Sequence, residues 1–386
     1  MRWNGQSLSG AAIIEREKYM LIPQNILNLK SYQPGRPIEE VREELGLKQV
    51  VKLASNESPF VSTRARQAIG RSLGQINRYP EGSCLYLRRR LAEKEGVSPD
   101  NILCGNGSDE IIDIIIKAFV GPGEEVLTSQ ATFLEYEIVA RINNRRVTTV
   151  PLKDFRYDLE AIRKKIGRRT KVIFIANPNN PTGTYVNKKE VADFLRHIPA
   201  SVITVFDQAY EQFVDVDDFP DAAKYIRGKN IITLHTFSKI YGLAGLRIGY
   251  ALARRELIGY MQKARLPFNV HCLAQAAARA VLDDRQYLKD TRRAILKEKE
   301  YVCGQLRKMG VSYIPSVTNF VLIDVGGDGY ALFQRLLRQG VIVRDMRQYG
   351  LNGFIRATIG RHSENRKFIY ALKAAFSVYG KQVKKI

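Results

Sequence analysis

Residues 230–250 read NIITLHTFSKIYGLAGLRIGY, an apolar run that ends on a short polar segment containing Lys239. The β-branched residues predict a buried strand, with the lysine at its end. An isolated ammonium is costly to desolvate and its pKa falls, which makes the amine a nucleophile for aldehydes. Glycines at 242, 245 and 249 permit close backbone approach, and Arg247 lies within reach of an anion held near the lysine. Taken alone, the pattern also fits an exposed lysine at a strand end.

This strand is one of a series between about residues 100 and 255, where short β-branched runs alternate with helical patterns. The runs are EEVLTS (124–129), RRVTTVPL (145–152), KVIFIANP (171–178), SVITVFD (201–207), NIITLHTFS (230–238) and RIGYALA (247–253). The alternation predicts an α/β fold with a mainly parallel sheet flanked by helices. After about residue 270, a long helical stretch precedes the strands TNFVLIDV, GVIVRDM and GFIRATIG and a last helix. We expect an N-terminal arm (1–45), a large domain (46–270) and a smaller α+β domain (271–386).

Composition narrows the class of protein. No run reaches the roughly 18 apolar residues of a membrane helix, and the N-terminus has only the short patch AAII, so we expect a cytoplasmic protein with no membrane partner. Four separated cysteines and four histidines predict reduced thiols and no metal site. The net charge of +22 could indicate nucleic acid, but clusters such as 88–90 and 163–165 fall on amphipathic helical segments. We therefore expect solvated faces, no nucleic-acid partner and a modest attraction for small anions.

Polar residues also mark the ends of two of these strands. Asp207 ends the run VITVF, and Tyr210 stands three residues later. A buried carboxylate there can keep a ring nitrogen protonated, although Asp after a strand is also a common helix cap. The segment NPNNPTG (177–183) breaks both helix and strand directly after KVIFIA, so Asn180 lies where open α/β sheets bind ligands, or in an ordinary turn.

The segment GNGSDE (105–110) lies between the run NILC and the apolar helix IIDIIIKAF. Small residues such as Gly107 leave the first N–H groups of that helix open, so a phosphate can dock there. Ser108 and Asp109 fit this role, and they also fit simple helix caps. Phe133, after the next strand, can stack on a flat ring or belong to the core.

With these pieces in order, the chain resembles the fold-type I pyridoxal-phosphate enzymes and, among them, the histidinol-phosphate aminotransferases. The likeness runs from about residue 25 to 380. It includes SYQPGRPIEEVREELGL, KLASNESPF, NRYPEGS, NGSDE, ANPNNPTG, FDQAY, TFSKIYGLAGLRIGY, LPFNV, TNFVLI, VIVRDMRQYGL and IRATIG.

The resemblance implies pyridoxal 5'-phosphate as the cofactor and a role for each matching residue. Lys239 would bind the cofactor as a Schiff base, Asp207 would pair with its ring nitrogen, and Tyr210 would contact its ring oxygen. Tyr79 would reach the cofactor phosphate of a neighbouring subunit, which requires a homodimer with shared active sites. The other implied cofactor contacts are Gly107, Ser108, Asp109, Phe133, Asn180, Thr236, Ser238 and Arg247. Implied substrate contacts are Tyr32, Asn56, Arg344 and Arg356, the two arginines forming a phosphate clamp.

The resemblance also implies a reaction. Transamination between L-histidinol phosphate and 2-oxoglutarate would give imidazole-acetol phosphate and L-glutamate, a step of histidine biosynthesis. Two alternatives on the same scaffold stay open, an aromatic amino acid aminotransferase and a threonine-phosphate decarboxylase. A basic binding protein that keeps the fold without catalysis has no recognition helix, zinc motif or aromatic RNA-binding strand in its favour.

Overall fold

The computed structural model describes residues 22–31, 33–226 and 228–383. Its centre is a seven-stranded sheet in the order β2-β8-β7-β6-β5-β3-β4. All neighbouring strands are parallel except β8, which runs antiparallel to β2 and β7. The strands are β2 (Ile102–Gly105), β8 (Gly249–Ala253), β7 (Ile231–Thr236), β6 (Ile203–Asp207), β5 (Thr170–Ala176), β3 (Glu125–Ser129) and β4 (Arg146–Val150).

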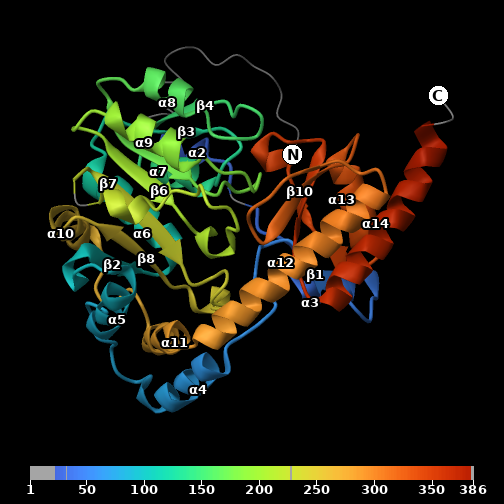
Figure 1. The fold of residues 1–386 in the computed structure, drawn as a ribbon, viewed down its shortest axis with the longest axis horizontal. Helices are drawn as coiled ribbons and strands as arrows, with labels where there is room; N and C mark the ends of the chain where they lie inside the picture. Colours follow the sequence, from blue (N-terminus) through green and yellow to red (C-terminus); the bar gives the residue numbers. More distant parts are fainter. Residues whose placement is uncertain (1–21, 32, 227, 384–386) are drawn as a thin grey trace.

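Most of these strands are buried along their whole length, which explains why the sequence shows continuous apolar runs rather than alternation. Helices cover the sheet, as Figure 1 shows. They are α5 (Leu85–Glu95), α6 (Gly107–Phe119), α7 (Glu135–Ile142), α8 (Leu159–Lys165), α9 (Lys188–Arg196) and α10 (Arg255–Ala264), while α4 (Thr63–Ser72) packs on α11 (Cys272–Leu282). The predicted α/β fold with a mainly parallel sheet is confirmed.

A smaller antiparallel sheet, in the order β12-β13-β10-β9, forms the other side of the molecule. Its strands are β9 (Tyr313–Ile314), β10 (Phe320–Asp324), β12 (Arg344–Asp345) and β13 (Phe354–Thr358). Around it lie α12 (Arg285–Lys308), α13 (Gly329–Arg338), α14 (His362–Val383) and α3 (Ile38–Leu45). The short α2 (Gln24–Leu27) instead packs against α7 of the large-sheet side. The predicted smaller α+β region is therefore present.

The two sides are joined by more than one crossing of the chain. β1 (Val51–Lys52), which follows the N-terminal segment, pairs in parallel with β11 (Val341–Ile342). α12 runs from the neighbourhood of α4 and α11 to the smaller sheet in Figure 1. Where the domains divide stays a prediction, because α11 lies beyond residue 270 yet packs on α4 and α5.

The parallel strands place the polar segments at one edge of the large sheet. β5, β6 and β7 end in order at Ala176, Asp207 and Thr236, and short 3-10 turns follow at η3 (Glu211–Phe213) and η5 (Ala244–Leu246). The carboxyl ends of parallel strands face the same way, so the loops after them converge. Among the described residues, no helix is long and apolar enough to span a membrane.

Candidate active site

A cavity of about 310 Å³ lies at this edge of the large sheet, between the strand ends and the smaller sheet. Its size suits a small ligand. Twelve of the residues predicted for the site line it: Asn56, Ser108, Asp109, Phe133, Asn180, Asp207, Tyr210, Thr236, Ser238, Lys239, Arg247 and Arg356.

Lys239 lies at the floor of the cavity, in the turn that follows β7. Its side chain is half-buried, and its Nζ donates a hydrogen bond to the carbonyl oxygen of Ser55 at 3.2 Å. The same nitrogen lies 5.6 Å from the centroid of the Tyr210 ring. The amine is therefore held between the two sides of the cavity, within reach of an electrophile placed there.

Asp207 is buried at the end of β6 and supplies the carboxylate of the site. The Tyr136 hydroxyl donates to its Oδ2 at 2.7 Å, and the Ala209 N–H donates to its Oδ1 at 3.1 Å. Burial raises the pKa of Asp207, and these two hydrogen bonds oppose that rise. Both contacts are neutral donors, so a cationic group in the cavity would further stabilise the ionised carboxylate.

Tyr210 links the sheet side of the cavity to the opposite side. Its hydroxyl accepts a hydrogen bond from Nδ2 of Asn56 at 3.0 Å, and burial raises the pKa of the phenol to about 12. Asn56 adopts a φ of 56° and is held by Thr358 of β13, whose Oγ1 accepts from its N–H at 2.9 Å. The phenol is therefore neutral and fixed in place.

Arg356 is the cation of the opposite side. It comes from β13, is only 4% exposed, and donates from Nη2 to the carbonyl oxygen of Ala54 at 2.7 Å. Its Nη1 donates to Oδ1 of Asn180, while its Nε is buried with no hydrogen-bond partner among the described residues. A buried guanidinium with an unused donor is suited to an anionic substrate group.

The start of α6, called the cradle below, is suited to binding an anion. The N–H groups of its first turn lack intrahelical partners, and the helix dipole adds positive potential there. Arg247 projects over this turn, pairing with Asp109 at 2.8 Å and lying 3.4 Å from Oγ of Ser238. Glycine is needed at two positions, because a Cβ at Gly107 would lie 2.6 Å from Arg247 Nη2 and one at Gly249 would lie 2.8 Å from the Ser108 nitrogen.

Phe133 provides a flat apolar surface in the cavity. Its ring meets Tyr136 edge-on, with centroids 5.6 Å apart, and Tyr136 stacks on Phe174 with centroids 4.7 Å apart. The Phe133 ring is thereby oriented by a buried aromatic stack.

Four of the predicted residues do not line the cavity. Gly107 is the first residue of α6. Tyr79 is 83% exposed and stacks on Phe268, with ring centroids 4.7 Å apart. Arg344 is buried beside the cavity but does not line it, and its Nη2 donates to Oε1 of Gln348 at 3.1 Å. Tyr32 lies outside the described residues.

The structure also adds residues that the sequence reasoning missed. Ser55, Glu57 and Tyr349 line the cavity, and Tyr136 holds Asp207 from below. Ser55 and Glu57 flank Asn56 in the quoted motif KLASNESPF, and Tyr136 stands one helical turn after Phe133, so adjacency was the available signal. Tyr349 lies in the quoted motif VIVRDMRQYGL, but only the packing of the smaller sheet brings its side chain to the cavity.

Comparisons with known proteins agree with this geometry. Residues 48–372 match the family model for class I and II aminotransferases. The chain is 43% identical over 351 residues to a histidinol-phosphate aminotransferase of Moorella thermoacetica, covering 90% of this chain and 91% of that protein. It is 43% identical over 350 residues to the enzyme of the same name from Caldicellulosiruptor saccharolyticus, covering 90% and 98%.

Among solved structures, the fold is similar to that of histidinol-phosphate aminotransferase from Sinorhizobium meliloti, determined in complex with pyridoxal-5'-phosphate. The TM-score is 0.85 at 29% identity, with 94% of this chain and 99% of that one covered.

Proposed function

Because the chain belongs to the class I and II aminotransferases, we propose that it transfers the amino group of L-histidinol phosphate to 2-oxoglutarate, with pyridoxal phosphate as cofactor. The products are imidazole-acetol phosphate and L-glutamate. The observation that carries the substrate is the 43% identity, over 90% of the chain, to two relatives named for this reaction.

The residues present fit the proposed cofactor. Asp207 is a buried carboxylate whose described contacts are neutral, which suits a protonated ring nitrogen. The cradle at the start of α6 is kept open by Gly107 and Gly249, which suits a phosphate. Lys239 lines the same cavity, which suits an aldehyde.

When bound, pyridoxal phosphate supplies an aldehyde and a ring that draws electrons from the substrate's α-carbon. The protein's own residues orient it and move protons. The phosphate would be held by Ser108, Ser238 and Arg247. The shape of the cradle is set by Gly107, Asp109 and Thr236. The Phe133 ring would cover the cofactor ring. Asp207 keeps the ring nitrogen protonated, and Tyr210 with Asn180 binds the ring hydroxyl. The Lys239 amine would hold the aldehyde, and as a free amine it would move the proton at the substrate α-carbon.

The opposite side of the cavity is proposed to hold the substrate. Arg356 presents a buried guanidinium, and Asn56 fixes the loop that faces it. Histidinol phosphate has a phosphate but no carboxylate, so Arg356 would bind the phosphate, joined by Arg344 if that side chain turns toward the cavity. Tyr32 belongs to the same predicted set.

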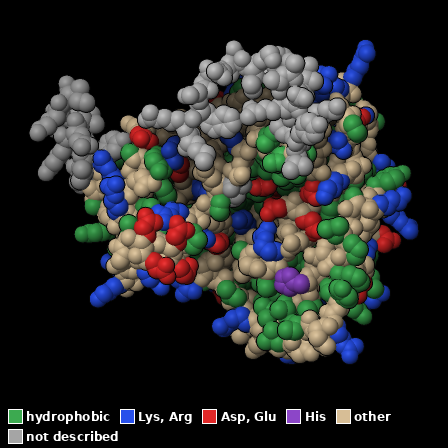
Figure 2. All heavy atoms as spheres, turned by 180° about the vertical axis from the view of Figure 1, so that it is seen from behind, with side chains coloured by type: hydrophobic (Ala, Val, Ile, Leu, Met, Phe, Trp, Pro, Cys, Tyr) green, Lys and Arg blue, Asp and Glu red, His purple; other side chains and the backbone are tan. Residues whose placement is uncertain are grey.

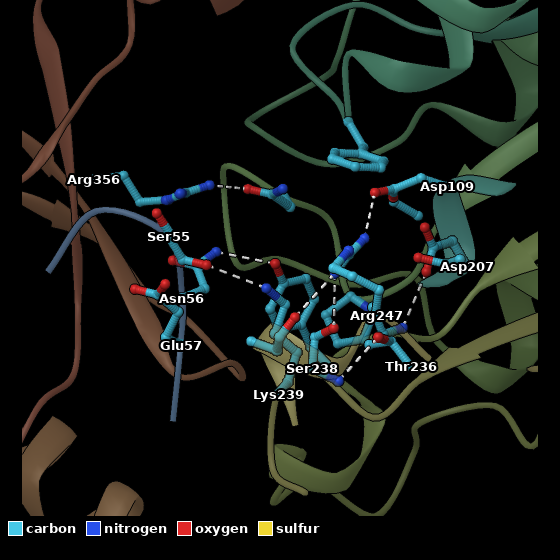
Figure 3. Close-up of a pocket in the computed structure, with 18 of the residues that line it drawn as sticks. Ser55, Asn56, Glu57, Asp109, Asp207, Thr236, Ser238, Lys239, Arg247 and Arg356 are labelled. Carbon is cyan, nitrogen blue, oxygen red and sulfur yellow. Dashed lines mark hydrogen bonds and ion pairs between the residues drawn. The ribbon is translucent and has the colours of Figure 1, made fainter. Parts of the chain in front are cut away.

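We also propose a cytoplasmic homodimer with shared active sites. Exposed hydrophobic side chains cluster in sequence around α4, α5 and the loop before α11: Leu73, Ile76, Tyr79, Tyr86, Leu266 and Phe268. Figure 2 shows hydrophobic side chains gathered on the lower part of the molecule, where these helices lie. A contiguous apolar surface favours burial against a second copy, and Tyr79 would then be carried to the neighbouring cradle.

A donor panel tests the proposal. The purified protein loaded with pyridoxal phosphate is incubated with 2-oxoglutarate and one donor at a time: L-histidinol phosphate, L-phenylalanine or L-threonine phosphate. We expect glutamate to form fastest with L-histidinol phosphate and more slowly with phenylalanine, because a phosphate carries more negative charge and more acceptor oxygens than the single carboxylate of phenylalanine.

Two outcomes would contradict the assignment. Release of carbon dioxide from threonine phosphate would favour a decarboxylase, a reading that Arg356 allows because a guanidinium binds a carboxylate as readily as a phosphate. Preference for phenylalanine would favour an aromatic aminotransferase. Each result still leaves the cofactor assignment to be judged by the visible absorbance of the loaded protein.

A further inference from the structure

A cluster of charged and polar side chains lies behind the strand end that leads to the active-site lysine. Successive side chains of a strand point to opposite faces, so His235 lies on the face of β7 opposite Thr236, which lines the cavity. His235 is 2% exposed, and its ring stacks on Tyr250 of β8 with centroids 4.7 Å apart. The Tyr250 hydroxyl donates to Glu95 at 2.9 Å. None of His235, Tyr250 and Glu95 lines the cavity.

The imidazole joins two segments that both carry cavity residues. Nδ1 of His235 lies 2.9 Å from Oε1 of Glu211, and Nε2 lies 2.8 Å from Oγ1 of Thr233. Glu211 begins η3, directly after Tyr210, whereas His235 directly precedes Thr236. One partly buried hydrogen bond therefore ties the loop after β6 to the end of β7.

The charges around the imidazole balance only when it is protonated. Glu211 and Glu95 supply two carboxylates, and Lys94, which is paired with Glu95, supplies one ammonium. The phenols are neutral, because burial raises the pKa of Tyr241 to about 12 and that of Tyr250 well above its usual value. A neutral imidazole would leave one uncompensated negative charge in a buried cluster, which is costly.

The electrostatic influence of the imidazole extends to the cavity. Burial lowers the pKa of His235, but the carboxylates of Glu211 and Glu95 together outweigh burial and the net shift is upward. Burial raises the pKa of Asp207, and the charge on His235 is one of the influences that oppose this rise. A cation behind the sheet therefore favours the ionised form of the carboxylate in front of it.

We propose that His235, as an imidazolium hydrogen-bonded to Glu211, is a positioning residue for the transamination. It holds the ends of β6 and β7 together behind the cavity and favours the ionised Asp207 that binds a protonated ring nitrogen. This role rests on the function proposed above.

The test compares His235→Gln, Glu211→Gln and the double variant in the full-length holoenzyme. His197→Gln is the matched control, because His197 is exposed at the end of α9 and contacts only a backbone carbonyl there. For both single variants we expect the dissociation constant of pyridoxal phosphate to rise about tenfold and kcat to fall about tenfold, with KM within about twofold of wild type. The double variant should be no worse than either single one, because the two residues act as a unit.

A nitrogen NMR titration of the histidine rings gives a readout that needs no disruptive variant. In the wild-type holoenzyme, we expect the His235 ring to lose its proton above the ordinary value of 6.5. In Glu211→Gln, the midpoint should fall below that of the wild type, because the neighbouring negative charge is gone.

The outcomes separate the two proposals. A wild-type His235 ring that is neutral at pH 6.5, or a folded His235→Gln variant with unchanged cofactor affinity and kcat, would overturn the positioning role alone. A wild-type protein that binds no pyridoxal phosphate would overturn the proposed function and the positioning role with it.

Discussion

The two sides of the cavity are built differently. The sheet side is made of strand ends and the start of α6. Asp207 and Thr236 are the last residues of buried strands, and Lys239 stands three residues after β7. The opposite side is made of segments far apart in the chain: the N–H of Asn56 donates to Thr358, 302 residues away. On the first side a local segment positions each group, and on the second side the packing of distant segments does so.

This difference predicts which kinetic constant each side controls. Groups on the sheet side orient the proposed cofactor, whose chemistry is common to every substrate, so changes there should lower cofactor affinity and kcat. Groups on the opposite side face the substrate, so changes there should mainly raise KM.

Lys239→Ala should have the largest effect, because no other amine lines the cavity among the described residues. We expect turnover to fall on the order of 10³-fold or more, with loss of the visible absorbance of covalently held cofactor. Lys188→Ala is the matched control, because Lys188 is an exposed lysine on α9 that donates to the Asp217 carbonyl oxygen. Normal turnover in Lys239→Ala would refute the assignment of the whole sheet side.

Arg356→Lys should change substrate binding more than cofactor binding. The substitution keeps the charge but loses the planar fork, so we expect KM for L-histidinol phosphate to rise roughly 10- to 100-fold, with a smaller change in kcat. Steady-state kinetics at saturating cofactor measure the split.

Arg344→Lys sharpens the same comparison. In this structure Arg344 lies outside the cavity and contacts Gln348, so its effect on KM should be smaller than that of Arg356→Lys. Equal effects would instead support the two-arginine phosphate clamp expected from the resemblance and would require Arg344 to turn inward when substrate binds.

The same division explains how much could be predicted from the sequence. The α/β class, the strand series and the sheet-side residues follow from local patterns. A polar residue at the end of an apolar run must lie at the end of a buried strand, which is where the loops of the sheet converge. The pairing of β1 with β11 could not be predicted, since a two-residue strand gives no periodic signal. Tyr349 was missed because only the packing of the smaller sheet brings its side chain to the cavity.

Tyr79 and Tyr136 also differ from the prediction, each for its own physical reason. Tyr79 was expected beside a cofactor phosphate, yet in a single chain it is exposed, because that role needs a second subunit. Tyr136 was missed because its pattern is that of a core aromatic, and only the fold brings its hydroxyl to Asp207. The roles of all these residues stay predictions until variants are measured.

Gly107→Ala tests the sheet side without removing a charged group. Gly107 has a φ of +79°, and an added Cβ would lie 2.6 Å from Nη2 of Arg247, so the guanidinium must move from the cradle. We expect a loss of about 1 kcal/mol in stability and a roughly five- to tenfold rise in the dissociation constant of pyridoxal phosphate. Gly259→Ala, in open space on α10, should leave cofactor affinity unchanged. Equal affinity in both variants would contradict the cradle.

Glu135→Gln should have the smallest effect, and it tests the electrostatics at the edge of the sheet side. Glu135 is half-buried in the first turn of α7, where burial, and then the charge of Asp109, raises its pKa to about 7 from the usual 4.5. The folded protein therefore holds a proton that the unfolded chain releases between these values, so this group's contribution is fully favourable below pH 4.5 and is lost as the pH rises through 7. Glutamine cannot ionise, so the melting temperatures of variant and wild type should agree near pH 4.5, and the variant should melt higher above pH 7. Glu137→Gln changes another glutamate of the same helix and removes its pair with Arg141. The difference in melting temperature between this variant and the wild type should not grow with pH in the same way. A wild-type advantage above pH 7 would mean that Glu135 is stabilised as a carboxylate, and would place a cation rather than Asp109 as its dominant neighbour.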